Sequence, residues 1–222
     1  MTATETTATE RTVVGDLDAS VHALVFAIAH EVGNHLGAVR IQAHLLDEDL
    51  DPRSLAQASV EIDGLAGRAG PMLALLRPLL SPDTRAASGA HWSGLLAAIR
   101  QHLEDEGTRG VSVEIEAPGD SDALAPGADW LHSLLIVLLD ATFAMTPHGG
   151  TIRFGLDSRD GESILCLEDD GAEEDLSPAA SLRGRPLAVA LARELLPRLG
   201  GRVETRRAES TTRVELVFPA AN

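Results

Sequence analysis

The sequence contains no lysine, so all 18 basic residues are arginines, and they face 34 aspartates and glutamates. Without lysine, the chain cannot work as a phosphate-loop ATPase, form a Schiff base or use the ATP clamp of a protein-kinase fold. The formal charge of −16 repels phosphate backbones, so nucleic-acid binding is not expected. A single cysteine, Cys166, excludes an internal disulfide framework and a zinc site built from cysteines.

Long hydrophobic runs are also missing from the sequence. No apolar stretch approaches the roughly 20 residues needed to span a bilayer. The Thr-rich start over 1–15 lacks the apolar core of a signal peptide, and we expect it to be disordered. With 44% hydrophobic and 23% charged residues, the composition is that of a globular protein. We therefore expect a cytoplasmic protein without membrane contact.

Two apolar patterns with helical spacing fill the segment 16–80, on either side of the helix-breaking pair Asp51-Pro52. The first is expected to run from about Asp16 to Leu50. Two long helices joined by a tight turn form an antiparallel hairpin, which alone leaves apolar surface exposed. Pairing of two hairpins into a four-helix bundle buries that surface, so a homodimer is expected. We expect the dimer contact to centre on Val25, Val32, Leu36, Ile62, Leu65 and Met72.

The segment 81–90 contains Pro, Ser and Gly and is predicted to be a linker. Beyond it, over 91–219, helical and strand patterns are mixed. Helices are predicted over 93–106, 128–145 and 186–199, and strands over 111–116, 151–157, 163–168, 202–206 and 213–218. The fold class is therefore α+β: a helical hairpin followed by an α/β sandwich with helices on one face of a sheet.

The most distinctive local feature is His30 with Glu31 beside it and Asn34 one helical turn later. Helical spacing directs His30 away from the apolar pattern. An imidazole on a bare helical face can act as a nucleophile toward a docked protein, and Glu31 can fix its tautomer by accepting one N–H. The expected neighbours on that face are small or polar: Ala23, Ala27, Asn34 and Gly37.

Two other interpretations of His30 remain open on the pattern alone. It can be an ordinary solvated histidine, since exposed histidines are common. It can also belong to a metal site with Asn34 and His44, although the histidines of this helix point in different directions around it.

Residues 30–34 (His-Glu-Val-Gly-Asn) resemble the H-E-x-x-N phosphoacceptor box of the dimerisation and histidine-phosphotransfer domain of bacterial sensor histidine kinases. His35-Leu36 stands where that family usually has Pro-Leu. The region 91–219 is similar to the ATP-binding domain of the same family, which has the Bergerat fold. The order and spacing of elements extend the resemblance over about residues 16–219. It implies that His30 is the phosphoacceptor, with Glu31 and Asn34 as its catalytic neighbours.

The resemblance also locates a nucleotide pocket. Its first segment lies on the helix predicted over 128–145, where the family has an Asn box. Asp140 stands in place of the magnesium-binding Asn and can still suit Mg²⁺ as a carboxylate. Ile136 replaces the other Asn and Phe143 replaces a basic residue, and neither side chain can contact a phosphate.

The other two segments of the implied pocket are also incomplete. Asp169 and Gly171 match the D-x-G-x-G box, which makes Asp169 the candidate adenine-reading carboxylate or, alternatively, part of a tight turn after a strand. Glu173 replaces the second Gly of that box. Gly184 begins the segment that should cradle phosphates, but Pro186 lacks the N–H that such a cradle supplies. ATP binding is therefore expected to be very weak or absent.

A phosphoacceptor hairpin beside a degenerate nucleotide domain resembles the histidine phosphotransferases of the ChpT type. That resemblance implies a relay of phosphoryl groups between receiver domains of response regulators, with Mg²⁺ brought by the receiver and no cofactor of the chain's own. Two alternatives remain: a divergent ATP-dependent histidine autokinase, and a non-catalytic pseudokinase adaptor that binds a response regulator.

Overall fold

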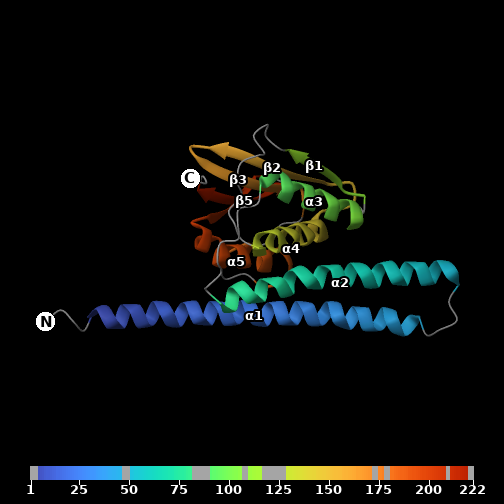
Figure 1. Ribbon diagram of the computed structural model, residues 1–222, viewed down its shortest axis with the longest axis horizontal. Coiled ribbons are helices and arrows are strands. Elements are labelled where there is room, and N and C mark those ends of the chain that lie inside the picture. Colours follow the sequence, from blue (N-terminus) through green and yellow to red (C-terminus); the bar gives the residue numbers. More distant parts are fainter. Residues whose placement is uncertain are drawn as a thin grey trace.

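The computed structural model describes residues 5–46, 51–81, 91–106, 110–116, 129–171, 175–177, 181–208 and 211–219. Figure 1 shows two parts: a long antiparallel pair of helices, and a layered α/β unit that lies against one side of it. This arrangement confirms the predicted α+β fold with a helical N-terminal region.

The hairpin consists of α1 (Glu5–Leu45) and α2 (Pro52–Leu80). Asp51 caps α2, because its carboxylate accepts hydrogen bonds from the backbone N–H groups of Arg53 and Ser54 at 2.9 and 3.2 Å. Pro52 follows in the first turn, where a helix needs no backbone donor. Within the turn, 47–50 lies outside the described residues, so the predicted helix end at Leu50 falls there.

The start of α1 corrects one prediction. The helix begins at Glu5, so residues 5–15, which were expected to be disordered, are helical, while 1–4 lie outside the described residues. No proline interrupts the sequence from Glu5 to Leu45, and adding a residue to an existing helix is far easier than starting one. The helix therefore continues past the part that packs on α2 (Figure 1).

The α/β unit contains a five-stranded sheet in the order β1-β2-β3-β5-β4. Strands β1 and β2 are parallel, and the other neighbours are antiparallel. The strands are β1 (Ser112–Glu116), β2 (Thr151–Arg159), β3 (Glu162–Asp169), β4 (Arg202–Ala208) and β5 (Thr211–Pro219). The helices are α3 (Trp92–Glu106), α4 (Asp129–Met145) and α5 (Gly184–Leu195), and a 3₁₀ turn (Leu196–Leu199) follows α5.

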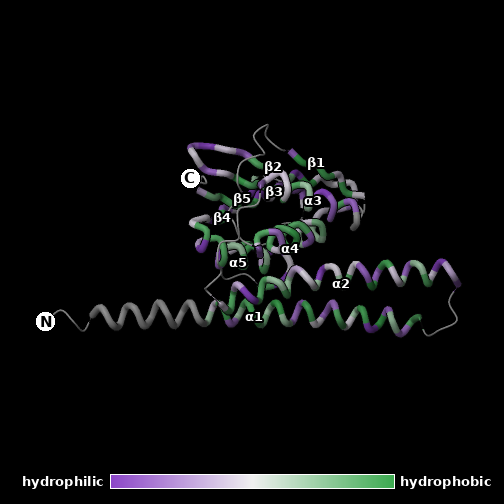
Figure 2. The backbone as a smooth tube through the Cα atoms, viewed as in Figure 1, coloured by the Kyte–Doolittle hydropathy of each residue, from purple (hydrophilic) through white to green (hydrophobic). Residues whose placement is uncertain are grey.

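Helix α4 is the apolar centre of the molecule. It lies between the sheet and the hairpin, and its residues 134–139 are all buried (Figures 1 and 2). It packs against α2, α3 and α5. A helix that is buried on all sides over this stretch has little polar surface left to offer a ligand.

One hydrophobic core joins the hairpin to the α/β unit. Leu24, Ile28 and Val32 of α1 belong to the same cluster as α4 and α5. Arg198, after α5, donates a hydrogen bond to the carbonyl of Pro78 near the end of α2. That carbonyl lies in the last turn of α2, where helix carbonyls have no partner within the helix. None of the described helices is both long enough and apolar enough to cross a membrane.

Candidate functional site

His30 lies on an exposed face of α1, as its spacing predicts. Phe26 and Ile41, at helical spacing from it, are 76% and 65% exposed. Gly33 and Gly37 stand on the same face with open space where a Cβ would be. The imidazole therefore stands over bare backbone one turn from the exposed Phe26, and the exposed Ile41 lies three turns farther along the same face. Another protein can dock on such a surface.

The other small neighbours expected around His30 are mostly where the pattern placed them. Ala23 and Asn34 are exposed, whereas Ala27 is half-buried and packs against the core. Ala27 therefore packs beneath this face and contributes little to its accessible surface.

Glu31 is half-buried and contacts Asn34, whose side-chain amide donates to Glu31 Oε2 at 3.5 Å. In this described part of α1, no hydrogen bond or ion pair joins Glu31 to His30. Glu31 also lies close enough to His35 to raise the pKa of that imidazole. The structure thus turns Glu31 toward Asn34 and His35, and its action on the tautomer of His30 stays a prediction.

His35, where the family usually has proline, lies at the junction between the hairpin and the α/β unit. Burial lowers its pKa most, and Arg68 of α2 lowers it further, while Glu31 and Asp140 raise it less. The carboxylate of Asp140 in α4 is therefore near enough for its charge to act on His35. Its Oδ1 lies 2.9 Å from Nε2 of His102 in α3, so Asp140 links α4 to α3.

The Asn-box positions on α4 do not fit a nucleotide with its metal. Asp140, the expected metal ligand, is paired with His102. Ile136 is buried, and Phe143 packs against the core. Among the residues that the structure describes, no three side chains of histidine, cysteine, aspartate or glutamate come together to hold a metal ion.

Asp169 ends β3 and is engaged within the chain. It is 2% exposed, and its partner Arg185, in the first turn of α5, is 0% exposed. Arg185 Nη1 donates to Asp169 Oδ2 at 2.5 Å, and the N–H of Gly171 donates to Oδ1 at 2.8 Å. Burial raises the pKa of Asp169, while the charge of Arg185 lowers it less. Both oxygens of the expected adenine-reading carboxylate therefore already accept hydrogen bonds from the chain.

The two retained glycines have conformational roles. A Cβ on Gly171 would lie 2.4 Å from Asp169 Oδ1 and 2.9 Å from the carbonyl oxygen of Met145, so this position admits only glycine. Packing within the chain therefore accounts for Gly171 without a nucleotide. Gly184 has a positive φ of 51° at the start of α5. Pro186, two residues later, removes a backbone donor from that helix end, and Glu173 lies outside the described residues.

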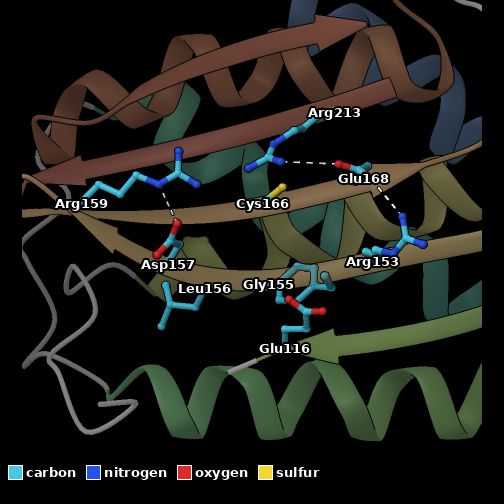
Figure 3. Close-up of a pocket in the computed structure, with 10 residues that line it drawn as sticks. Glu116, Arg153, Gly155, Leu156, Asp157, Arg159, Cys166, Glu168 and Arg213 are labelled. Carbon is cyan, nitrogen blue, oxygen red and sulfur yellow. Dashed lines mark hydrogen bonds and ion pairs between the residues drawn. The ribbon is translucent and has the colours of Figure 1, made fainter. Parts of the chain in front are cut away.

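A hollow of about 500 Å³ lies on the sheet face opposite α4, over the paired residues Gly155 and Cys166 (Figure 3). Burial raises the pKa of Cys166 to about 11, so the thiol is protonated at neutral pH and is a poor nucleophile. Three arginines around the hollow are paired with carboxylates: Arg159 with Asp157 (2.7 Å), Arg153 with Glu168 (3.1 Å) and Arg213 with Glu168 (3.5 Å). This hollow therefore does not place a nucleophile beside a group that could activate it.

A second hollow, of about 850 Å³, follows the hairpin. Its walls come from both helices and from α3: Ala38, Gln42, Val60, Glu61, Gly64, Arg68 and His102. Ala38 is eight residues after His30, about 12 Å along the helix axis. The hollow therefore lies farther along the hairpin than His30, toward the turn between the two helices.

Comparisons with known proteins show the fold. No family model matches the sequence, and no curated protein matches it. The histidine kinase AdeS of Acinetobacter baumannii has a similar structure, with a TM-score of 0.60 and 14% identity over 87% of this chain and 98% of that one. Full-length ShkA, solved in complex with AMPPNP, is also similar, with a TM-score of 0.56 and 15% identity over 90% of this chain and 46% of that one.

A bacterial phosphotransferase of known structure is also similar, with a TM-score of 0.51 and 18% identity over 90% of this chain and 95% of its own. At these identities the likeness concerns the fold alone. The chain therefore has a histidine kinase-like fold, as the resemblance in its sequence predicted.

Proposed function

We propose that this protein is a histidine phosphotransferase of a two-component phosphorelay. It would accept a phosphoryl group from the aspartate of one receiver domain on His30 and pass it to the aspartate of another. The observation that carries the proposal is the exposed imidazole of His30 on a bare helical face, in a fold whose Asp169 is already paired with Arg185.

The transfer is balanced without any co-substrate. A ring nitrogen of neutral His30 attacks phosphorus and forms a P–N bond. The P–O bond of the acyl phosphate breaks, and its electron pair returns to the receiver's aspartate as a carboxylate. Attack by the second receiver's aspartate reverses these steps. Phosphoryl transfer of this kind depends on positioning and on charge stabilisation more than on covalent help from the protein.

Features around His30 support docking of a receiver domain. Phe26 and Ile41 supply exposed apolar contact on either side of the imidazole, and Gly33 and Gly37 let a partner approach the backbone closely. Mg²⁺ would come with the receiver, because Asp140 is engaged by His102. The residues of the hairpin would hold and orient the partner, and His30 would carry the group.

The described residues favour this function over an ATP-dependent autokinase. An autokinase needs an adenine-reading carboxylate, whereas Asp169 is buried and paired. It also needs polar groups for metal and phosphates, whereas Ile136 and Phe143 are part of the apolar packing of α4. We therefore propose that the protein uses no ATP. A non-catalytic adaptor can be told apart from a phosphotransferase by experiment, because the output of an adaptor would not depend on His30.

We also propose that the protein acts as a homodimer through the hairpin. Of the residues predicted for the contact, Val32 is buried, and Val25 and Met72 are half-buried and pack against the core of one chain. Leu36 is 57% exposed, and exposed apolar side chains also remain on α2, Val60 and Leu73 among them. Leu36 lies about 120° around the helix from His30, so a partner hairpin can cover it while His30 stays accessible.

A labelling experiment tests the proposed function. Receiver domains encoded in the same genome are phosphorylated with labelled acetyl phosphate, purified and mixed with the protein, and an unlabelled receiver is added later. We expect label on the protein as an acid-labile, base-stable adduct that then moves to the second receiver. The proposal fails if none of these receivers labels the protein.

A further inference from the structure

The hollow on the sheet face opposite α4 lies over a glycine that the fold itself does not require (Figure 3). Gly155 of β2 pairs with Glu116 of β1 and with Cys166 of β3, inside the sheet. Its φ is not positive, and a Cβ built on it would meet no atom nearer than 3.8 Å. Glycine inside a strand weakens the strand and often marks a place where a ligand approaches the backbone closely. An occupant of the hollow would therefore account for Gly155.

The charges around this hollow are balanced. Three arginines and three carboxylates line it: Arg153, Arg159, Arg213, Glu116, Asp157 and Glu168. Their formal charges cancel. Cys166 adds none, because burial raises the pKa of its thiol to about 11. A charged ligand would gain no net Coulombic attraction there and would lose part of its hydration, so the hollow favours an uncharged ligand.

The groups that surround the hollow favour a flat ring. Ion pairs with Asp157 and Glu168 fix the three guanidinium groups in place. A guanidinium is planar and weakly hydrated, and it stacks on aromatic faces. A ring laid across a strand glycine also covers backbone that has no side chain of its own. Phe154, the neighbour of Gly155, leaves this place open, because its side chain lies in the core on the other face of the sheet.

We propose that this hollow is a binding site for a small, flat, uncharged aromatic molecule that lies over Gly155 and Cys166. Its volume of about 500 Å³ is within the range of roughly 300–1,000 Å³ that is usual for small-molecule sites. Because α4 lies between the sheet and the hairpin, a ligand here is on the far side of the sheet from His30 (Figure 1). The proposal does not rest on phosphoryl transfer through His30.

An NMR titration of the isotope-labelled full chain with three matched probes tests the proposal. Naphthol is flat and uncharged, decahydronaphthol has a similar size but is not flat, and naphthoate is flat and charged. We expect naphthol to shift the amide signals of Gly155 and Cys166 saturably, with a dissociation constant of about 1 mM or less. Decahydronaphthol and naphthoate should bind at least about threefold more weakly, since the first cannot stack and the second is charged.

Variants of Gly155 locate the site. Gly155→Val fills the hollow from the strand and should abolish the naphthol shifts. It should also raise the melting temperature by about 1–4 °C, because a glycine is removed from a strand. Gly155→Ala, whose added Cβ has room, should weaken binding and covers the case in which Gly155→Val does not fold. Arg206→Ala removes an exposed arginine of β4 outside the hollow and should bind naphthol like the wild type.

Three results would overturn the proposal: naphthol shifts neither amide signal, decahydronaphthol or naphthoate binds as tightly as naphthol, or the Gly155 variants bind naphthol like the wild type. Labelling by phosphorylated receivers is scored separately, so failure of transfer through His30 leaves the titration result unaffected.

Discussion

The hairpin around His30 and the junction of β3 with α5 differ in the exposure and the pairing of their polar side chains. On the hairpin, His30 is exposed above two glycines, with Asn34 a turn away. At the junction, Asp169 is 2% exposed, and both of its oxygens accept hydrogen bonds. The first group is available to a partner, and the second is used by the chain itself.

Because of this difference, we expect phosphoryl transfer and folding stability to depend on different residues. An exposed side chain contributes little to the free energy of unfolding, so changes at His30 should affect transfer alone. A buried ion pair contributes through the penalty of breaking it, so changes at Asp169 should affect unfolding and leave transfer in the folded protein intact.

His30→Ala should lower the rate of phosphoryl acceptance by more than about 1,000-fold, since the nucleophile itself is removed. The measurement is label transferred from a phosphorylated receiver per unit time, together with the melting temperature, which should stay unchanged. His44→Ala removes another exposed histidine of α1 and is the matched control. Equal loss in both variants would contradict the assignment of His30.

Glu31→Ala should slow acceptance by roughly 10- to 1,000-fold, the range for losing a group that orients an acid–base partner. Glu31 contacts Asn34 in the structure, so Asn34→Ala should affect how the phosphoryl group is positioned or hydrolysed. Single-turnover kinetics and the decay of the phosphohistidine separate these two effects. Rates at the wild-type level in Glu31→Ala would remove Glu31 from the site.

Asp169→Ala leaves Arg185 buried without its carboxylate and should lower the free energy of unfolding by about 3–5 kcal/mol. Urea denaturation followed by circular dichroism measures this loss. At a temperature where the variant is folded, phosphoryl acceptance should match the wild type. Loss of transfer in the folded variant would show that the α/β unit takes part in the chemistry.

Leu36→Asp should shift the protein from dimer to monomer, because it places a charge in the proposed contact between hairpins. Light scattering at micromolar concentration measures the mass. Ala23→Asp introduces the same charge on an exposed position away from Leu36 and should leave the mass unchanged. A monomeric wild type would remove the dimer proposal.

The smallest expected effect concerns His35. Its pKa in the folded protein is held below the ordinary value of 6.5, chiefly by burial, so the unfolded chain binds this proton more readily. The folded state therefore keeps its full stability above about pH 6.5 and loses part of it as the pH falls toward the folded pKa. His35→Gln should show a smaller drop in melting temperature between pH 7.5 and 5.5 than the wild type. An equal drop would exclude His35 as a source of the acid sensitivity.

Local periodicity predicted much of this molecule. The helices and strands of 91–219 follow from apolar spacing and turn residues, and the exposed position of His30 follows from its angle relative to the apolar pattern. The helical start at Glu5 did not follow, because a Thr-rich polar segment gives no packing signal, although an adjacent long helix can extend into it.

The side-chain pairs that join elements of the α/β unit could not be predicted from sequence patterns. Arg185 and Asp169 lie 16 positions apart, and Asp140 and His102 lie 38 apart. Each pair forms only after a helix has packed against another element. The replacement of a phosphate-cradling segment by Gly184-Arg185-Pro186 was the one signal in the sequence, because an arginine there can reach a carboxylate at the end of β3.

In the proposed function, phosphate reaches His30 from a receiver aspartate and not from ATP. One preparation of the wild type, divided in two, tests it: one half receives labelled Mg-ATP, and the other receives a receiver domain carrying labelled aspartyl phosphate. Fragmentation mass spectrometry under mildly alkaline conditions then locates the phosphoryl group. We predict phosphohistidine at His30 with the receiver and no phosphohistidine with ATP. Phosphohistidine formed from ATP alone, or a phosphoryl group on any residue other than His30, would contradict this account.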